Sequence, residues 1–264
     1  MAIDRAVVLA DLQAEGDDLD AMVAGLAEPD WARPTPSPGW TVAHQVAHLA
    51  WTDVRTILAA TDQPGFAADL RRGMADPQRF VDEGAEQGAA QPPEELLAGW
   101  RKGRWAVLDA LAALPADARL PWYGPPMAPA SMATARLMET WAHGQDVADA
   151  LGLTREPTAR LRHVAHLGVR TRDFGFGVHG LTPPAEPFRV ELIAPDGSPW
   201  TWGPPGAAQR VTGPALHFCL LVSQRRHRGD LALAATGADA DRWLDIAQCF
   251  AGPAGSGRVP GQFS

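Results

Sequence analysis

The sequence lacks the features that mark several large classes of protein. Its 264 residues include two cysteines, Cys219 and Cys249, and no CxxC pair, so no disulfide framework is predicted. No apolar run is long enough to span a bilayer, and residues 1–20 are too acidic and too interrupted for a signal peptide. Together these absences predict a cytoplasmic protein in a reducing compartment.

Positive charge is scarce as well. The chain has 23 lysines and arginines against 31 acidic residues, a formal net charge of −8, and Lys102 is its only lysine. Proteins that bind nucleic-acid duplexes usually present a basic surface, so this balance disfavours a nucleic-acid partner. The hydrophobic share of 46% is ordinary for a globular protein and allows a full core. We therefore expect a small-molecule substrate, with neither nucleic acid nor membrane as a partner.

The first half of the chain contains a series of helical patterns. Four long segments have apolar residues at helical spacing: residues 3–26, 41–60, the segment that begins at Pro93, and 131–151. Thr41 is a predicted N-cap, and the proline- and glycine-rich residues 61–92 predict short helices and loops. Four long helices with such connections predict a four-helix bundle.

The period of the pattern changes in the second half. Residues 158–176 predict one more helix, and LTPPAEP after it is a natural boundary. Apolar alternation in FRVELIAPDGSPWTW, interrupted by a PDG turn, predicts two short strands, and residues 231–235 predict another strand between two further helices. The fold class is thus predicted to be α+β, with a helical-bundle domain over residues 1–180 and a small α+β domain over 181–264.

One helical stretch, METWAHGQDVADAL, carries an unusual polar stripe. Glu139, His143 and Asp146 follow one another at steps of four and three, so they share one helix face. Solvated helix faces usually carry pairs of Lys, Arg and Glu, whereas imidazole and carboxylate are ligands that zinc accepts. Glu139 and His143 could chelate one ion from adjacent turns, with a third ligand from another helix. A solvated stripe on an ordinary amphipathic helix is the alternative.

A pair of histidines lies in TVAHQVAHLAW, where His44 and His48 are one turn apart. Helices of a bundle can present ligands to the space between them. The E-x-x-x-H spacing lacks the H-E-x-x-H of zinc peptidases, so no general base is built in beside such a metal and a peptidase is not predicted. Trp40, Trp51 and Trp141 flank these segments and are candidates for the wall of a metal pocket.

These motifs resemble those of a known family. GWTVAHQVAHLAW, followed by the E-x-x-x-H-x-x-D pattern that begins at Glu139, resembles the DinB-like superfamily. More narrowly, the sequence is similar to proteins with the mycothiol-dependent maleylpyruvate isomerase N-terminal domain. Within that group it is most like an uncharacterised metal-binding subfamily, through APDGSPWTWGP, SQRRH and AQCFAGPAGSGR. The resemblance covers most of the chain and implies that the predicted bundle is DinB-like.

The resemblance implies a zinc ion held by His48, Glu139 and His143, with Asp146 as a partner that orients His143. Three protein ligands would leave the fourth position of a tetrahedral ion open, which is the catalytic arrangement. His44 has no fixed role in the family. It could be a fourth ligand, a general acid or a residue of the helix surface.

The resemblance also implies a thiol cosubstrate. In characterised relatives the open position takes the thiol of mycothiol, which zinc ionises, and the thiolate adds to an electrophilic double bond. Elimination after rotation makes such an enzyme an isomerase, whereas a retained thioether makes it an S-transferase. The isomerase's second domain supplies an arginine for substrate carboxylates, and SQRRHRGD offers Arg225, Arg226 and Arg228 for that role. Cations at a helix C-terminus are the simpler explanation of this run.

We therefore expect a zinc-binding, mycothiol-dependent isomerase or S-transferase that acts on a small electrophile. Two alternatives stay open at this point: a zinc hydrolase of a small molecule, and a non-catalytic module that uses a metal for stability and binds a small ligand.

Overall fold

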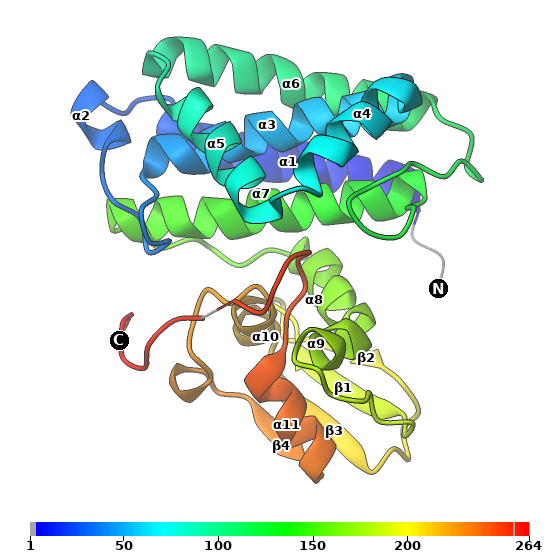
Figure 1. Cartoon of the computed structure of the whole chain (residues 1–264). Coiled ribbons are helices and arrows are strands. Elements are labelled where there is room, and N and C mark those ends of the chain that lie inside the picture. The colour runs from blue at the N-terminus through cyan, green and yellow to red at the C-terminus, as the bar shows by residue number, and fades with distance from the viewer. Residues whose placement is uncertain (1–3, 256, 264) are drawn as a thin grey trace. The chain divides into compact units, whose positions relative to one another are not determined.

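A bundle of long helices forms the first part of the chain (Figure 1). The computed structural model describes residues 4–255 and 257–263. Its four long helices are α1 (Arg5–Val23), α3 (Val42–Thr61), α6 (Pro93–Ala113) and α7 (Pro129–Leu151). Helix α1 packs against α7, α3 packs against α6, and α3 also contacts α7. The predicted four-helix bundle is confirmed, and the elements begin and end close to the predicted positions.

Three short helices connect or cover the long ones: α2 (Glu28–Trp31), α4 (Gln63–Gly73) and α5 (Pro77–Ala89). Two glycines of α5 allow it to approach α3 closely. A Cβ atom on Gly84 would lie 2.2 Å from the indole nitrogen of Trp51, and one on Gly88 would lie 2.6 Å from the Cβ of Ala47. Helix α5 therefore lies directly on the face of α3 that carries Trp51.

Apolar side chains fill the interior of the bundle. One buried cluster joins residues of all four long helices, among them Leu19, Val46, Leu49, Trp100 and Val147. The interior also holds a buried ion pair, because Arg136 of α7 donates to Asp53 of α3 from Nε at 3.2 Å and from Nη2 at 3.0 Å. This pair connects the two helices that carry the candidate site.

A four-stranded sheet and four α-helices form the described part of the second unit. The strands are β1 (Phe188–Ile193), β2 (Pro199–Trp202), β3 (Gln209–Pro214) and β4 (Ala234–Thr236), in the order β2-β1-β3-β4. Strand β1 is antiparallel to β2 and parallel to β3, and β3 is antiparallel to β4. The helices are α8 (Leu161–Arg170), α9 (Arg172–Val178), α10 (Ala215–Val222) and α11 (Ala238–Ile246). The α+β class is confirmed.

Strand β3 was not expected from the sequence. Its segment, QRVTGP, has one fully buried residue, Val211, and therefore shows no apolar alternation. The strand forms because β1 and β4 supply hydrogen-bonding partners on both of its edges. Two other predicted elements differ in their bounds. The strand predicted at 231–235 lies a few residues later, at β4, and the helix predicted at 158–176 is divided into α8 and α9.

The two units meet in the chain at the bond between Arg155 and Glu156. The sequence predicts this boundary at 180/181. The structure instead groups α8 and α9 with the second unit. The reason is their packing, because α8 contacts α10 and α9 contacts α11. None of the described helices combines the length and apolar character needed to cross a membrane.

Both cysteines are buried in the second unit. Cys219 lies on α10, where its thiol is 3.4 Å from the carbonyl oxygen of Leu161. Burial raises the pKa of the Cys219 thiol well above its ordinary value, and the neighbouring Cys249 contributes to the same shift. The sulfur of Cys219 therefore stays protonated at neutral pH.

Candidate metal centre

Side chains of α3 and α7 converge on one point inside the bundle. The Oε2 atom of Glu139 lies 3.4 Å from Nε2 of His48 and 3.1 Å from Nε2 of His143. Among the residues that the structure describes, these three form the group of His, Cys, Asp and Glu side chains whose possible ligand atoms lie within 4.8 Å of one another. The three residues named by the resemblance are thus brought together.

The group is largely shielded from solvent. The exposed fractions of the side chains are 10% for His48, 12% for His143 and 23% for Glu139, so the carboxylate is the most accessible member. Burial alone would raise the pKa of Glu139, but hydrogen bonds and charge interactions with His143 and His48 outweigh burial and hold this pKa well below its ordinary value. Glu139 is therefore an anion at neutral pH.

The donor set fits a divalent cation. Two imidazole nitrogens and one carboxylate oxygen are the ligand types of catalytic zinc sites such as His₂Glu. Both ring nitrogens face the same carboxylate oxygen, and within the described structure the buried Nδ1 of His48 has no hydrogen-bond partner. The His48 ring is therefore held through its Nε2 side, toward the other two donors.

Two tryptophans stand beside the imidazole rings, as the sequence suggested. The ring of Trp40 lies 5.3 Å from that of His48 and stacks on that of His143 at 6.0 Å, measured between ring centres. Trp51, one turn beyond His48 on α3, stacks on the His48 ring at 6.1 Å. Trp141 is buried, with the guanidinium of Arg155 over its ring.

A buried glutamine that sequence reasoning missed holds one of the histidines. Oε1 of Gln45 lies 2.5 Å from Nδ1 of His143, and Nε2 of Gln45 donates to the hydroxyl of Thr35 at 2.8 Å. Gln45 is fully buried. A signal was present in the sequence, because Gln45 is the polar residue between apolar Val42, Val46 and Leu49 on the inward side of α3.

Asp146 was expected to orient His143. It is fully buried on α7, one turn after His143, and the hydroxyl of Ser37 donates to its Oδ2 at 3.1 Å. His143 itself contacts Gln45 of α3, and the orienting role of Asp146 stays a prediction.

His44 lies at the start of α3. Its Nδ1 accepts from the backbone N–H of Thr41, the N-cap, at 3.3 Å and lies 2.8 Å from the Thr41 hydroxyl. The group of converging ligand atoms does not include His44. These contacts give His44 a role in capping α3; its use as a general acid stays a prediction.

The arginines of SQRRHRGD lie in the second unit, after α10. Arg225 donates to the carbonyl of Ser223 and Arg226 to that of Arg225, both at 2.7 Å, and the Arg226 guanidinium lies 3.9 Å from the ring centre of Phe263. Arg228 pairs with Asp241 and Asp245. Substrate binding by Arg225 or Arg226 stays a prediction.

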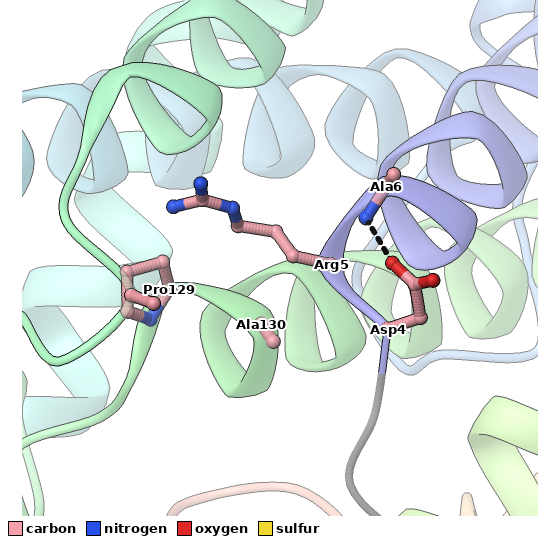
Figure 2. Close-up of a pocket in the computed structure, with 6 residues that line it drawn as sticks. Asp4, Arg5, Ala6, Pro129 and Ala130 are labelled. Atoms are coloured by element: carbon pink, nitrogen blue, oxygen red, sulfur yellow. Dashed lines mark hydrogen bonds between the residues drawn. The ribbon is translucent and has the colours of Figure 1, made fainter.

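A surface hollow elsewhere in the bundle shares no residue with this centre (Figure 2). It lies where α1 and α7 begin and is lined by Asp4, Arg5, Ala6, Ala116, Pro129 and Ala130. Arg5 donates to the carbonyl of Leu114 at the end of α6, which explains its position.

Fold and site together define the class of protein: a helical bundle with a His₂Glu donor group on two of its helices. A family model described as the mycothiol maleylpyruvate isomerase N-terminal domain matches residues 12–148, which is more than half of the chain. The chain belongs to this family, as its motifs indicated. A model described as wyosine base formation matches residues 184–236, the segment that contains all four strands.

Known proteins resemble the chain over nearly its full length. Two uncharacterised proteins of Mycobacterium tuberculosis, from strains CDC 1551 / Oshkosh and ATCC 25618 / H37Rv, are each 58% identical over 255 residues, which is 97% of this chain and 99% of each relative.

Two crystal structures have the same fold. That of the mycothiol-dependent maleylpyruvate isomerase matches with a TM-score of 0.60 at 14% identity, over 88% of this chain and 92% of that one. A histidine-to-alanine mutant of this isomerase matches with a TM-score of 0.57 at 13% identity, over 84% and 90%.

Proposed function

We propose that the protein is a zinc-binding, mycothiol-dependent enzyme, an isomerase or S-transferase, that acts on a small electrophile. The observation that carries the proposal is the convergence of His48, Glu139 and His143 from two helices of a bundle in this family. We propose these three residues as the ligands. Three protein ligands would leave one position of a tetrahedral ion for a cosubstrate.

A zinc ion in this site would lower the pKa of a coordinating thiol, so that the thiolate would be available at neutral pH. The residues of the chain would support that chemistry by their charge. Glu139 contributes one negative charge and the neutral histidines none, so a divalent ion in the site would keep a net positive charge. That remaining charge would favour an anionic sulfur.

The surroundings of the donors suit a reaction that must exclude water. The rings of Trp40 and Trp51 both lie against the His48 ring, and Trp40 also stacks on His143. A low-polarity wall lowers the local dielectric constant and so strengthens charge interactions inside the site. Glu139, as the most exposed donor, marks the side from which a cosubstrate would approach.

The ligand assignment is tested by metal analysis of purified full-length variants. We expect about one zinc per wild-type chain and strongly reduced zinc in His48→Ala and Glu139→Ala proteins, because loss of one of three ligands removes much of the binding free energy. His179→Ala, at an exposed histidine of the second unit, is the matched control and should keep its zinc. Unchanged zinc in both site variants would end the assignment.

The cosubstrate is tested with cobalt-substituted protein. Titration with mycothiol should produce a sulfur-to-metal charge-transfer band, and unrelated thiols should produce a weaker band or none. A band of equal strength with every thiol would contradict the mycothiol requirement. Absence of a band with all thiols would contradict thiol chemistry and favour a zinc hydrolase or a ligand-binding module.

A further inference from the structure

A directed chain of hydrogen bonds leads from His143 to the loop before α3. The carbonyl oxygen of Trp40 can only accept, so the hydroxyl of Thr35, 2.9 Å away, donates to it. The same hydroxyl oxygen then accepts from Nε2 of Gln45 at 2.8 Å. The amide of Gln45 is thereby oriented with its nitrogen toward Thr35 and its oxygen toward Nδ1 of His143.

This orientation decides which nitrogen of His143 carries the hydrogen. An amide oxygen can only accept, so Nδ1 of His143 must donate to Oε1 of Gln45. In the neutral ring one nitrogen carries a hydrogen and the other an electron pair. When a cation is bound, Nε2, which faces Glu139 at 3.1 Å, is therefore the nitrogen that offers the electron pair; without a cation, a hydrogen on Nε2 donates to the Glu139 carboxylate.

Burial strengthens this chain of hydrogen bonds. Gln45 is fully buried, so water does not replace a lost partner. Reversing its amide would give up the bond from the Thr35 hydroxyl to the Trp40 carbonyl, or would set two acceptors, Oε1 of Gln45 and the Thr35 oxygen, against each other. An unsatisfied buried polar group costs about 1–3 kcal/mol. The chain therefore favours one tautomer of His143.

We propose that Gln45 is the positioning residue that fixes His143 with Nε2 as its metal-binding nitrogen, and that Thr35 and the Trp40 carbonyl orient Gln45 for this task. The inference deepens the proposed function and rests on its metal-binding part. The loop 34–41 then serves the site twice, since the Trp40 ring stacks on the same imidazole that its carbonyl orients.

The tautomer is tested in the full-length protein by long-range ¹H–¹⁵N correlation of histidine rings, after zinc loading. The signals of His143 are assigned by their loss in His143→Gln. We expect a hydrogen on Nδ1 and metal on Nε2. The opposite pattern, with metal on Nδ1, would overturn the proposal.

Zinc affinity, measured by competition with a chromogenic chelator, tests the role of Gln45. Gln45→Met cannot accept from Nδ1, so its affinity should fall by roughly ten- to 100-fold, the usual effect of losing such a partner. Gln45→Glu keeps an acceptor and should restore most of the affinity. Gln145→Met, at a buried glutamine of α7 that donates to Asp149, is the matched control and should bind zinc like the wild type.

Thr35→Val provides an independent variant if circular dichroism shows that Gln45→Met does not fold. It removes the next link of the chain and should weaken zinc binding in the same direction. Wild-type affinity in every folded variant of Gln45 and Thr35 would overturn the proposal. If the wild-type protein bound no zinc, the metal-binding part of the proposed function would fail and this proposal with it, whereas zinc binding by the wild type with unchanged affinity in these variants would overturn the role of Gln45 alone.

Discussion

The buried ion pair between Asp53 and Arg136 offers the sharpest test of how the bundle aligns its two ligand helices. The exposed fractions of these side chains are 6% and 3%. Removing one partner leaves the other charge buried without compensation, which typically costs about 3–5 kcal/mol. We therefore expect Asp53→Leu and Arg136→Met each to lower the free energy of unfolding by about that amount.

The double variant Asp53→Leu/Arg136→Met should behave differently. Burial raises the pKa of Asp53, and the charge and hydrogen bonds of Arg136 offset only part of that effect. Because the pKa is raised on folding, ionisation of Asp53 disfavours the folded state, and this cost grows as the pH rises above the unfolded-state pKa of about 3.9. An apolar pair should therefore be about as stable as the wild type, or more stable by up to about 4 kcal/mol.

Urea denaturation of the full-length proteins, followed by far-UV circular dichroism, measures these differences. The exposed pair Arg79–Glu83 on α5 is the control, and its removal should leave the transition unchanged. The reasoning is refuted if each single variant loses less than about 1 kcal/mol, or if the loss in the double variant equals the sum of the single losses.

Three further outcomes are expected. Gly84→Ala should destabilise the protein by about 1–3 kcal/mol in thermal or urea unfolding, because the added methyl group would overlap Trp51. The control Gly99→Ala, at a helical glycine with open space around it, should be neutral or stabilising. Equal effects of the two substitutions would contradict the close packing of α5 on α3. The pKa of Tyr123 is raised by burial and by its bond to a buried carboxylate, so its contribution to stability is complete below pH about 10 and is lost as the pH rises further. Since Tyr123 is the single tyrosine, ultraviolet titration should give a higher midpoint in folded than in urea-unfolded protein, and equal midpoints would refute this. His44→Ala should keep full zinc content while lowering stability by about 1 kcal/mol through the lost cap, whereas loss of zinc would make His44 a ligand.

The sequence predicts the long helices of this chain because apolar residues recur at helical spacing along each of them. Thr41 was recognised as an N-cap from residue type alone, and α3 begins directly after it. Strand β3 was not recognised, since its formation depends on β1 and β4 and only Val211 within it is fully buried. The domain boundary depends on which unit α8 and α9 pack against, and such long-range packing leaves no local pattern.

The candidate site shows the same division. The spacing of Glu139 and His143 on one helix predicts that they act together, and this is a local property of α7. That His48 joins them depends on how α3 packs against α7, which no local pattern shows. The assignment of His48 therefore came from the family resemblance. The partner of His143 on α3 was missed, because the contact between Gln45 and His143 joins residues far apart in the chain and no motif rule covers it.

The buried sulfurs of α10 and of the segment after α11 have a practical consequence for experiments in which thiols are added to the protein. Cys219 and Cys249 are 0% and 3% exposed, and the thiol of Cys219 resists ionisation. A small thiol dissolved around the protein thus meets almost no accessible sulfur with which to form a mixed disulfide. In the proposed cobalt titration, the two cysteines of the chain would therefore neither consume the added thiol nor contribute to the sulfur-to-metal band.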